Sequence, residues 1–133
     1  MCGIVGYLGQ RDPSKVIING LKRLEYRGYD SSGIAFHMGN EIITKKCSGK
    51  VKDLEEILSE VNYNNKSDLA IGHTRWATHG IPDTINAHPH SDNLGKITLI
   101  HNGIIENYRT IRKHLEENGV EFKSDTDTEV LVQ

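Results

Sequence analysis

The chain has little of several features that mark specialised classes of protein. Its 133 residues include two cysteines, three prolines and one tryptophan, and aromatic residues make up only 6%. Two cysteines cannot build a disulfide framework, which favours a reducing compartment. The sequence has no apolar run long enough to cross a membrane and no secretory signal pattern at its start. We therefore expect a cytoplasmic protein with no membrane partner.

An excess of charge of one sign is also missing. The formal net charge is −2, with 16 basic and 18 acidic residues. This balance gives no general attraction to nucleic acid, so we expect no nucleic-acid partner. Hydrophobic residues make up 36% and charged residues 26%, as is usual in globular domains. A chain of this length is enough for one domain with a modest core.

What the chain does have is a mixture of strand and helix patterns. Asp12-Pro13 predicts a helix start, because an N-cap acceptor precedes proline at the first helical position. Gly39-Asn40 between two apolar segments predicts a hairpin. The predicted strands cover residues 3–8, 33–38, 41–47, 69–74, 96–101 and 120–123. The predicted helices run from residue 13 toward Gly28, from 50 to 61 and from 107 to 118, with Gly119 as a C-cap. This mixture favours an α+β architecture.

Two segments outside these predicted elements are also informative. Residues 75–95 form a long segment rich in glycine, proline, histidine and asparagine, and such long loops are often functional or disordered. Thr126-Asp127-Thr128-Glu129 fits a capping box that opens a helix. The chain stops a turn or two later, so we expect residues 1–133 to be part of a longer domain.

The residue with the greatest chemical potential is Cys2. A thiol alone is a weak nucleophile near neutral pH. If Met1 were removed, Cys2 would also carry the α-amine, whose pKa of about 7.7–8.0 suits a general base. One residue would then supply nucleophile and base, as in N-terminal threonine hydrolases. Taken alone, a cysteine that follows the initiator methionine is more simply interpreted as a coincidence than as a nucleophile.

Polar residues gather in three segments at the ends of predicted elements: 23–33, 72–80 and 101–103. Functional residues often lie on loops that a rigid scaffold positions. Each segment also has a structural interpretation. Asn102-Gly103 is a common turn dipeptide, Arg75 could be a surface cation, and Asp127 could be an acidic residue in a first helical turn.

Together with Cys2-Gly3-Ile4-Val5-Gly6, these segments resemble the glutaminase domain of the class II glutamine amidotransferases, which are N-terminal nucleophile hydrolases. The resemblance spans essentially the whole chain. It implies a four-layer α-β-β-α sandwich, of which residues 1–133 would be the N-terminal part. The motifs most similar to the branch that makes glucosamine 6-phosphate from fructose 6-phosphate lie in residues 23–33, 75–80, 86–90, 101–107 and 126–130.

The resemblance implies a role for each candidate site residue. Cys2 would attack the side-chain amide carbon of glutamine and form a glutamyl thioester. The Asn102 side-chain amide and the Gly103 backbone N–H would stabilise the oxyanion, and one such donor is typically worth about 10²–10³ in rate. The residues that would hold the charged groups of glutamine are Arg75, Thr78 and His79 for the carboxylate and Asp127 for the ammonium.

Three further residues would surround the site. The resemblance implies that Trp76 lies in a loop that closes over glutamine and helps to gate an ammonia passage. Anchoring of the loop on the core is an equally good interpretation of this tryptophan. Arg27 and Tyr29 resemble positions near the passage and the domain interface.

The sequence and the resemblance together limit the partners. None of the seven histidines has a recognised zinc-site spacing, so we expect no metal, and no cofactor. Cys47 is interpreted as structural. The expected substrate is glutamine. Fructose 6-phosphate would bind only through a sugar isomerase domain that is absent here, and the parent enzyme is expected to be a homo-oligomer.

Two alternatives remain open. The first is the glutaminase domain of another class II amidotransferase, such as phosphoribosylpyrophosphate amidotransferase or asparagine synthetase, although residues 25–31 argue against it. The second is a binding fragment that the truncation leaves without catalytic activity.

Overall fold

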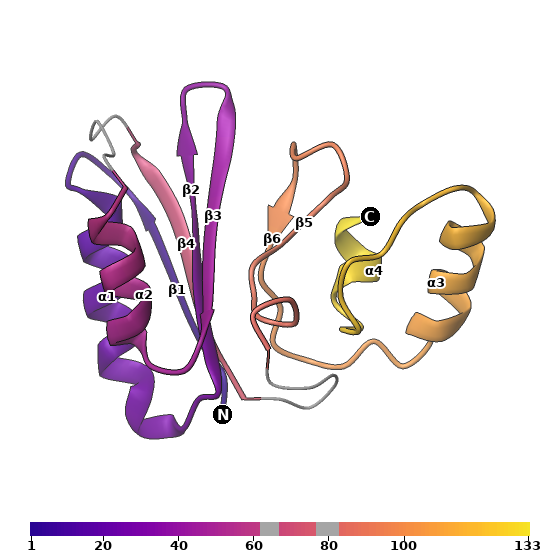
Figure 1. The fold of residues 1–133 in the computed structure, drawn as a ribbon, viewed down its shortest axis with the longest axis horizontal. Helices are drawn as coiled ribbons and strands as arrows, with labels where there is room; N and C mark the ends of the chain where they lie inside the picture. Colours follow the sequence, from indigo (N-terminus) through magenta and orange to yellow (C-terminus); the bar gives the residue numbers. More distant parts are fainter. Residues whose placement is uncertain (62–66, 77–82) are drawn as a thin grey trace.

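The computed structural model describes residues 1–61, 67–76 and 83–133. Figure 1 shows helices α1 and α2 against a four-stranded sheet, with β5 and β6, then α4 and α3, beyond its other face. The elements are β1 Gly3–Leu8, α1 Pro13–Leu24, the 3-10 helix η1 Glu25–Arg27, β2 Ser31–Met38, β3 Glu41–Ser48, α2 Val51–Ser59, β4 Leu69–Arg75, β5 His90–Ser91, β6 Thr98–Leu99, α3 Tyr108–Glu117 and α4 Glu129–Val132. The fold is therefore mixed α+β, as the sequence predicts.

The four-stranded sheet has the order β1-β4-β2-β3, and every neighbouring pair is antiparallel. Its face toward α1 and α2 carries the main core. Ile17, Leu21, Ile34, Val51 and Leu54 in that core are completely buried. Removing these apolar side chains from water supplies most of the drive for helix and sheet to pack.

The N-terminal elements follow their predictions closely. The strand β1 has the predicted bounds, and α1 begins after Asp12, whose carboxylate accepts the Ser14 N–H at 3.0 Å. The hairpin of β2 and β3 turns at Gly39, which has φ +63°. At the end of α3 the C-cap is Asn118, one residue before the predicted Gly119, which has φ +86°.

Several predictions for the second half are wrong. Residues 120–123 form no strand among the described residues; their backbone is held by side chains, such as Asn93, whose amide donates to the Glu121 carbonyl at 3.0 Å. The strand predicted at 96–101 shortens to Thr98–Leu99. The loop predicted at 75–95 contains the partner strand β5. All of α3 is described and none of its residues is fully buried, because the helix lies at the far end of the molecule (Figure 1).

The capping box predicted at 126–129 is also wrong. The helix α4 begins after Thr128, which makes no side-chain capping bond. The Glu129 carboxylate instead accepts the backbone N–H of Ser124 at 2.6 Å and of Lys123 at 2.9 Å. Glu129 therefore ties down the preceding segment rather than the first turn of its own helix.

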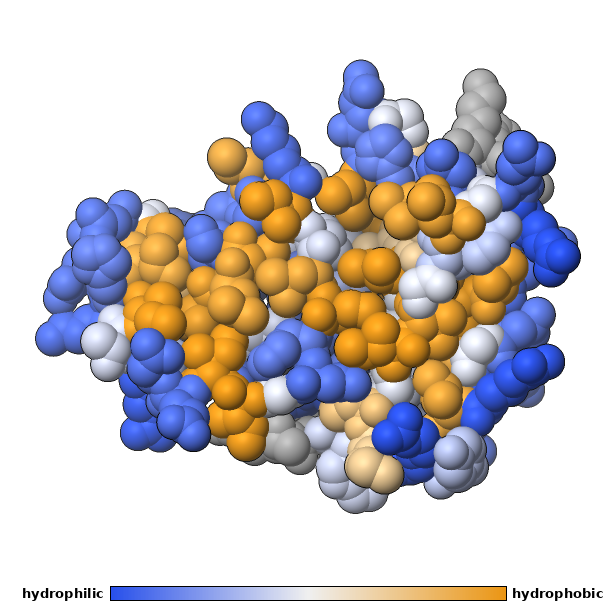
Figure 2. Space-filling model, turned by 180° about the vertical axis from the view of Figure 1, so that it is seen from behind, coloured by the Kyte–Doolittle hydropathy of each residue, from blue (hydrophilic) through white to orange (hydrophobic). Residues whose placement is uncertain are grey.

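Much of one surface is apolar. Figure 2 shows hydrophobic side chains gathered over a broad area of the face seen from behind. Leu8, Leu94 and Ile97 are among the large apolar side chains that are more than half exposed. Apolar surface of this extent is typical of a contact surface or of a site of aggregation. None of the helices in the described residues has the length and apolar character needed to cross a bilayer.

Candidate active site

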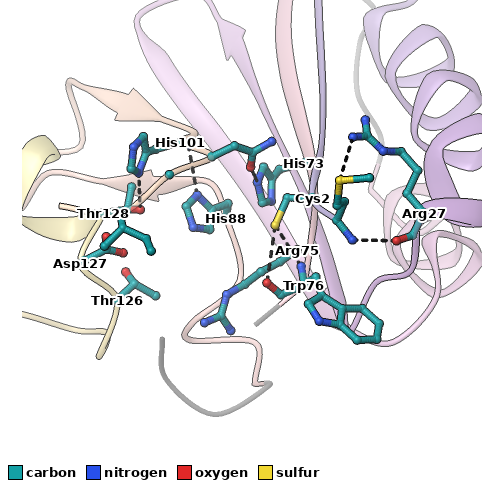
Figure 3. Close-up of a pocket in the computed structure, with 14 residues that line it drawn as sticks. Cys2, Arg27, His73, Arg75, Trp76, His88, His101, Thr126, Asp127 and Thr128 are labelled. Atoms are coloured by element: carbon teal, nitrogen blue, oxygen red, sulfur yellow. Dashed lines mark hydrogen bonds between the residues drawn. The ribbon is translucent and has the colours of Figure 1, made fainter. Parts of the chain in front are cut away.

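A pocket of about 520 Å³ lies between the end of the four-stranded sheet and the C-terminal segment. This volume is in the range of about 300–1,000 Å³ that small-molecule sites usually have. Figure 3 shows Asp127 and its neighbours on one wall and Cys2, Trp76 and Arg27 on the other. The pocket is lined by Met1, Cys2, Arg27, His73, Arg75, Trp76, His88, His101, Asn102, Gly103, Ile104, Thr126, Asp127 and Thr128.

The pairing of β1 with β4 positions Cys2. Gly3 is opposite Thr74 in the register, and its N–H donates to the Thr74 hydroxyl at 3.1 Å. The residue before β1 therefore lies beside the residues that end β4. The Trp76 N–H donates to Cys2 Sγ at 3.1 Å, and the Cys2 thiol lies 3.6 Å from the Trp76 carbonyl oxygen. Cys2 is thus held at the mouth of the pocket by backbone groups.

Met1 and Arg27 lie next to this thiol. The ammonium of Met1 donates to the Arg27 carbonyl at 2.7 Å, and Met1 is 71% exposed. Of the two residues predicted near the ammonia passage and the domain interface, Arg27 lines the pocket and Tyr29 does not. The Trp76 side chain is 52% exposed, which argues against its interpretation as an anchor in the core.

Asn102 and Gly103 occupy the turn that follows β6. Asn102 Oδ1 lies 2.6 Å from Nε2 of His73, which is a residue of β4. Ile105, just beyond the turn, donates its N–H to Asp127 Oδ2 at 2.7 Å. The turn is therefore attached both to the sheet and to the C-terminal segment.

Two buried groups of opposite charge line the same pocket. Arg75 and Asp127 are each 4% exposed, and Figure 3 shows the Arg75 guanidinium between the two walls. Arg75 is buried where β4 ends, so its interpretation as a surface cation is wrong. Asp127 precedes α4, so it is not in a first helical turn. A guanidinium binds carboxylates well, and a carboxylate can bind an ammonium.

The remaining predicted substrate ligands, Thr78 and His79, lie outside the described residues, so their predicted roles are not tested. Cys47 is a buried free thiol whose Sγ lies 3.3 Å from the Ser32 hydroxyl. Burial raises the pKa of the Cys47 thiol, which fits a structural residue better than a nucleophile.

Sequence reasoning missed a stack of buried histidines, two of which, His73 and His88, line the pocket. The rings of His73 and His88 are stacked 4.3 Å apart, and His88 meets His90 edge to face at 4.6 Å. Burial lowers the pKa of His73 to about 4 and that of His90 to about 3, and it lowers the pKa of His88 further. All three rings are therefore neutral at pH 7. No group of side chains among the described residues is suited to hold a metal ion.

Comparison with known proteins gives a consistent set of matches. The family model described as a glutamine amidotransferase domain matches residues 59–133. The glutamine–fructose-6-phosphate aminotransferase of Pyrococcus horikoshii is 54% identical over 132 residues, which are 98% of this chain and 22% of that protein. The enzyme of the same name from Chlamydia muridarum is 54% identical over 100% of this chain and 22% of its own length. This chain thus spans about a fifth of the length of these curated relatives.

Solved structures share the fold at lower identity. The glutamine phosphoribosylpyrophosphate amidotransferase of B. subtilis, complexed with ADP and GMP, superposes with a TM-score of 0.79 at 31% identity. The match covers 98% of this chain and 28% of that one. A second structure, described as the allosteric regulatory enzyme of purine biosynthesis, gives a TM-score of 0.77 at 29% identity, over 98% of this chain and 28% of its own.

Proposed function

Because the chain belongs to the family of class II glutamine amidotransferase domains, we propose that it hydrolyses the side-chain amide of glutamine to glutamate and ammonia. One observation carries this proposal. A single pocket brings the thiol of Cys2 together with the Asn102–Gly103 turn and with the buried charges of Arg75 and Asp127. A nucleophile, an oxyanion site and a receptor for a zwitterion are what amide hydrolysis of a free amino acid requires.

The nucleophile needs Met1 to be removed. While Met1 is present, the nitrogen of Cys2 is part of a peptide bond and cannot accept a proton. Removal leaves an α-amine on the same residue as the thiol, where it acts as the general base and returns the proton to the departing ammonia. Loss of Met1 also frees the Arg27 carbonyl and widens the pocket beside the thiol.

The other pocket residues divide between chemistry and recognition. Asn102 and the Gly103 N–H stabilise the oxyanion of the tetrahedral intermediate. Arg75 binds the α-carboxylate of glutamine, with Thr78 and His79 completing that contact. Asp127 binds the α-ammonium: Ile105 occupies one carboxylate oxygen, and a carboxylate has a second oxygen to offer.

The exposed Trp76 lies beside bound glutamine and helps to gate the passage of ammonia. Arg27 lies beside this passage, and Tyr29 lies near the domain interface. The complete domain is a four-layer α-β-β-α sandwich to which residues 1–133 contribute the N-terminal part.

In the parent enzyme, ammonia passes to an isomerase domain and converts fructose 6-phosphate to glucosamine 6-phosphate. Support for this acceptor comes from the 54% identity to the aminotransferases, against 31% to the phosphoribosylpyrophosphate amidotransferase, whose likeness is one of fold. We propose a cytoplasmic homo-oligomer for this parent. The acceptor is tested by measuring glutamine turnover in the parent enzyme. If a phosphoribosyl donor stimulated this turnover and fructose 6-phosphate left it unchanged, the assigned acceptor would be wrong.

The test of the hydrolase begins with intact mass, which separates chains that keep Met1 from chains that have lost it. Processed chain should release ammonia from glutamine and should react once with a glutamine-like electrophile. Unprocessed chain and Cys2→Ala should do neither. Cys47→Ala is the matched control and should react as the unchanged chain does. Processed chain that releases no ammonia and takes no label would support the inert binding fragment instead.

A further inference from the structure

One hydrogen bond joins the sheet directly to the side chain of Asn102. His73 Nε2 lies 2.6 Å from Asn102 Oδ1, and the two residues are 29 positions apart. His73 is 1% exposed and lies on β4, two residues before Arg75. The proposed mechanism gives His73 no role, although this ring contacts the side chain that is proposed to stabilise the oxyanion.

The contact has two possible proton arrangements. A neutral imidazole carries one N–H. In the first arrangement, Nε2–H donates to Asn102 Oδ1 and leaves His73 Nδ1 as an unpartnered acceptor. In the second, the amide is turned over and donates to Nε2, which leaves a buried Nδ1–H. His73 Nδ1 is buried and has no hydrogen-bond partner among the described residues. Orphaned buried N–H donors are rarer than unsatisfied acceptors, so the first arrangement is favoured.

We infer that His73 is a positioning residue that fixes the orientation of the Asn102 amide. By donating from Nε2, the His73 ring holds Asn102 Oδ1 against the sheet. The amide nitrogen, with its two donors, is then directed away from His73 and remains available to an oxyanion in the pocket. This inference rests on the proposed function, in which Asn102 is an oxyanion donor.

The surroundings of His73 keep the ring in place and keep it neutral. The His88 ring stacks on it, and His88 Nδ1 accepts the backbone N–H of His101 at 3.4 Å. The residue before Asn102 is thereby tied to the same stack. Besides His88 and His90, the charged or titratable groups that interact with His73 are Arg75 and His101, which oppose its protonation, and Asp30, which favours it. Desolvation lowers the pKa of His73 by more than the Asn102 hydrogen bond and Asp30 raise it, so the ring is neutral at pH 7 and carries one N–H.

The first test needs no catalytic activity. Two-bond ¹H–¹⁵N correlation spectra of the uniformly labelled chain report which ring nitrogen of each histidine carries the proton. His73 should be the Nε2–H tautomer at pH 7 and should stay neutral for as long as the chain is folded, with the signal assigned by its loss in His73→Phe. An Nδ1–H tautomer, or a ring that is charged at pH 7, would overturn the inference whether or not the chain hydrolyses glutamine.

The second test is a kinetic cycle on the processed chain. His73→Phe keeps a flat ring on His88 but removes the donor, and it should lower kcat for glutamine about 10–10²-fold while KM changes less than about twofold. His73→Gln retains an N–H donor and should recover most of the loss. His114→Gln, on the exposed face of α3, is the control for histidine replacement.

The decisive variant is the double substitution His73→Phe with Asn102→Ala. If His73 acts through Asn102, the double variant is no slower than Asn102→Ala alone, because the amide to be oriented is already gone. Losses that multiply would show that His73 acts independently of Asn102 and would overturn the inference. If the unchanged, processed chain does not turn over glutamine, the proposed function fails, and the tautomer spectrum alone decides the role of His73.

Discussion

The buried histidine stack predicts that the fold is sensitive to mild acid. His73, His88 and His90 are each at most 5% exposed, and burial holds the pKa of each well below its usual value of 6.5. The unfolded chain therefore binds more protons than the folded chain when the pH lies below about 6.5 and above the folded pKa values. Stability is fully present above that window and falls as the pH drops through it.

The size of the effect follows from the difference in pKa. At pH 5, a histidine with an unfolded pKa of 6.5 and a folded pKa of about 4 or less costs about 2 kcal/mol of unfolding free energy. Three such rings together cost about 6 kcal/mol, which is comparable with the whole stability of many domains, about 5–15 kcal/mol. We therefore expect a chain that is folded at pH 7.5 to be largely unfolded, or close to it, at pH 5.

Two other titratable groups with shifted pKa values do not complicate this window. Burial lowers the pKa of Lys46 to about 8, so Lys46 is protonated in both states below pH 7. Burial would raise the pKa of Glu129, but hydrogen bonds from Lys123 and Ser124 outweigh burial and lower it below 4.5. Glu129 therefore stays ionised in the folded chain until the pH is well below 5.

Urea unfolding followed by circular dichroism between pH 7.5 and 5 measures the effect. Near pH 5 the free energy should fall by about 4 kcal/mol per pH unit, which corresponds to nearly three protons taken up on unfolding. His90→Gln should reduce this uptake by about one proton, whereas His114→Gln, at an exposed position on α3, should leave the stack's contribution intact. An uptake below one proton near pH 5 in the unchanged chain would refute the assignment of three buried neutral rings.

Three further predictions test other parts of the molecule. Gly33→Ala should cost more than about 2 kcal/mol of stability, because an added Cβ would overlap the backbone carbonyl of His88, whereas Gly6→Ala, with nothing within 4 Å, should cost less than 1 kcal/mol by urea unfolding. Since burial lowers the pKa of Lys46 to about 8, stability should rise between about pH 8 and 10, and Lys46→Met should remove that rise. Asp127→Asn keeps an acceptor for the neighbouring backbone N–H but loses the charge, so KM for glutamine should increase about 10–10²-fold, with little change in melting temperature.

Strong local periodicity explains which elements the sequence predicts well. The apolar residues of α1 recur on one face, and Asp12 marks its start, so the bounds of this helix depend on neighbours along the chain. The hairpin around Gly39 is equally local. Residues 120–123 contain apolar residues, as the correctly predicted strands do. A strand also needs a partner strand, and no local pattern reports whether one is available.

Long-range contacts explain what the sequence leaves out. The Thr126–Glu129 spacing fits a capping box, yet Thr126 bonds His90, 36 residues away, and Glu129 bonds the segment before it. The same is true of the pocket. Cys2, Arg75, Asn102 and Asp127 could be named because they belong to motifs that resemble a family, whereas the stacking of His73, His88 and His90 depends on long-range contacts that no local motif reports.

The two walls of the pocket come from different parts of the chain, and this division links the catalytic and the stability predictions. The antiparallel pairing of β1 and β4 brings Cys2 beside Trp76 whatever the second half does. Asn102 and Asp127 reach the same pocket only if the C-terminal segment stays against the sheet, and the stack from His73 to His90 lies at that junction.

Protonating the stack should therefore separate the oxyanion turn from the nucleophile. Glutamine hydrolysis by processed chain should then be lost over the same pH range as the folded structure, with kcat falling no later than the circular dichroism signal. Full activity at a pH where the stack is protonated would show that the junction does not need neutral rings.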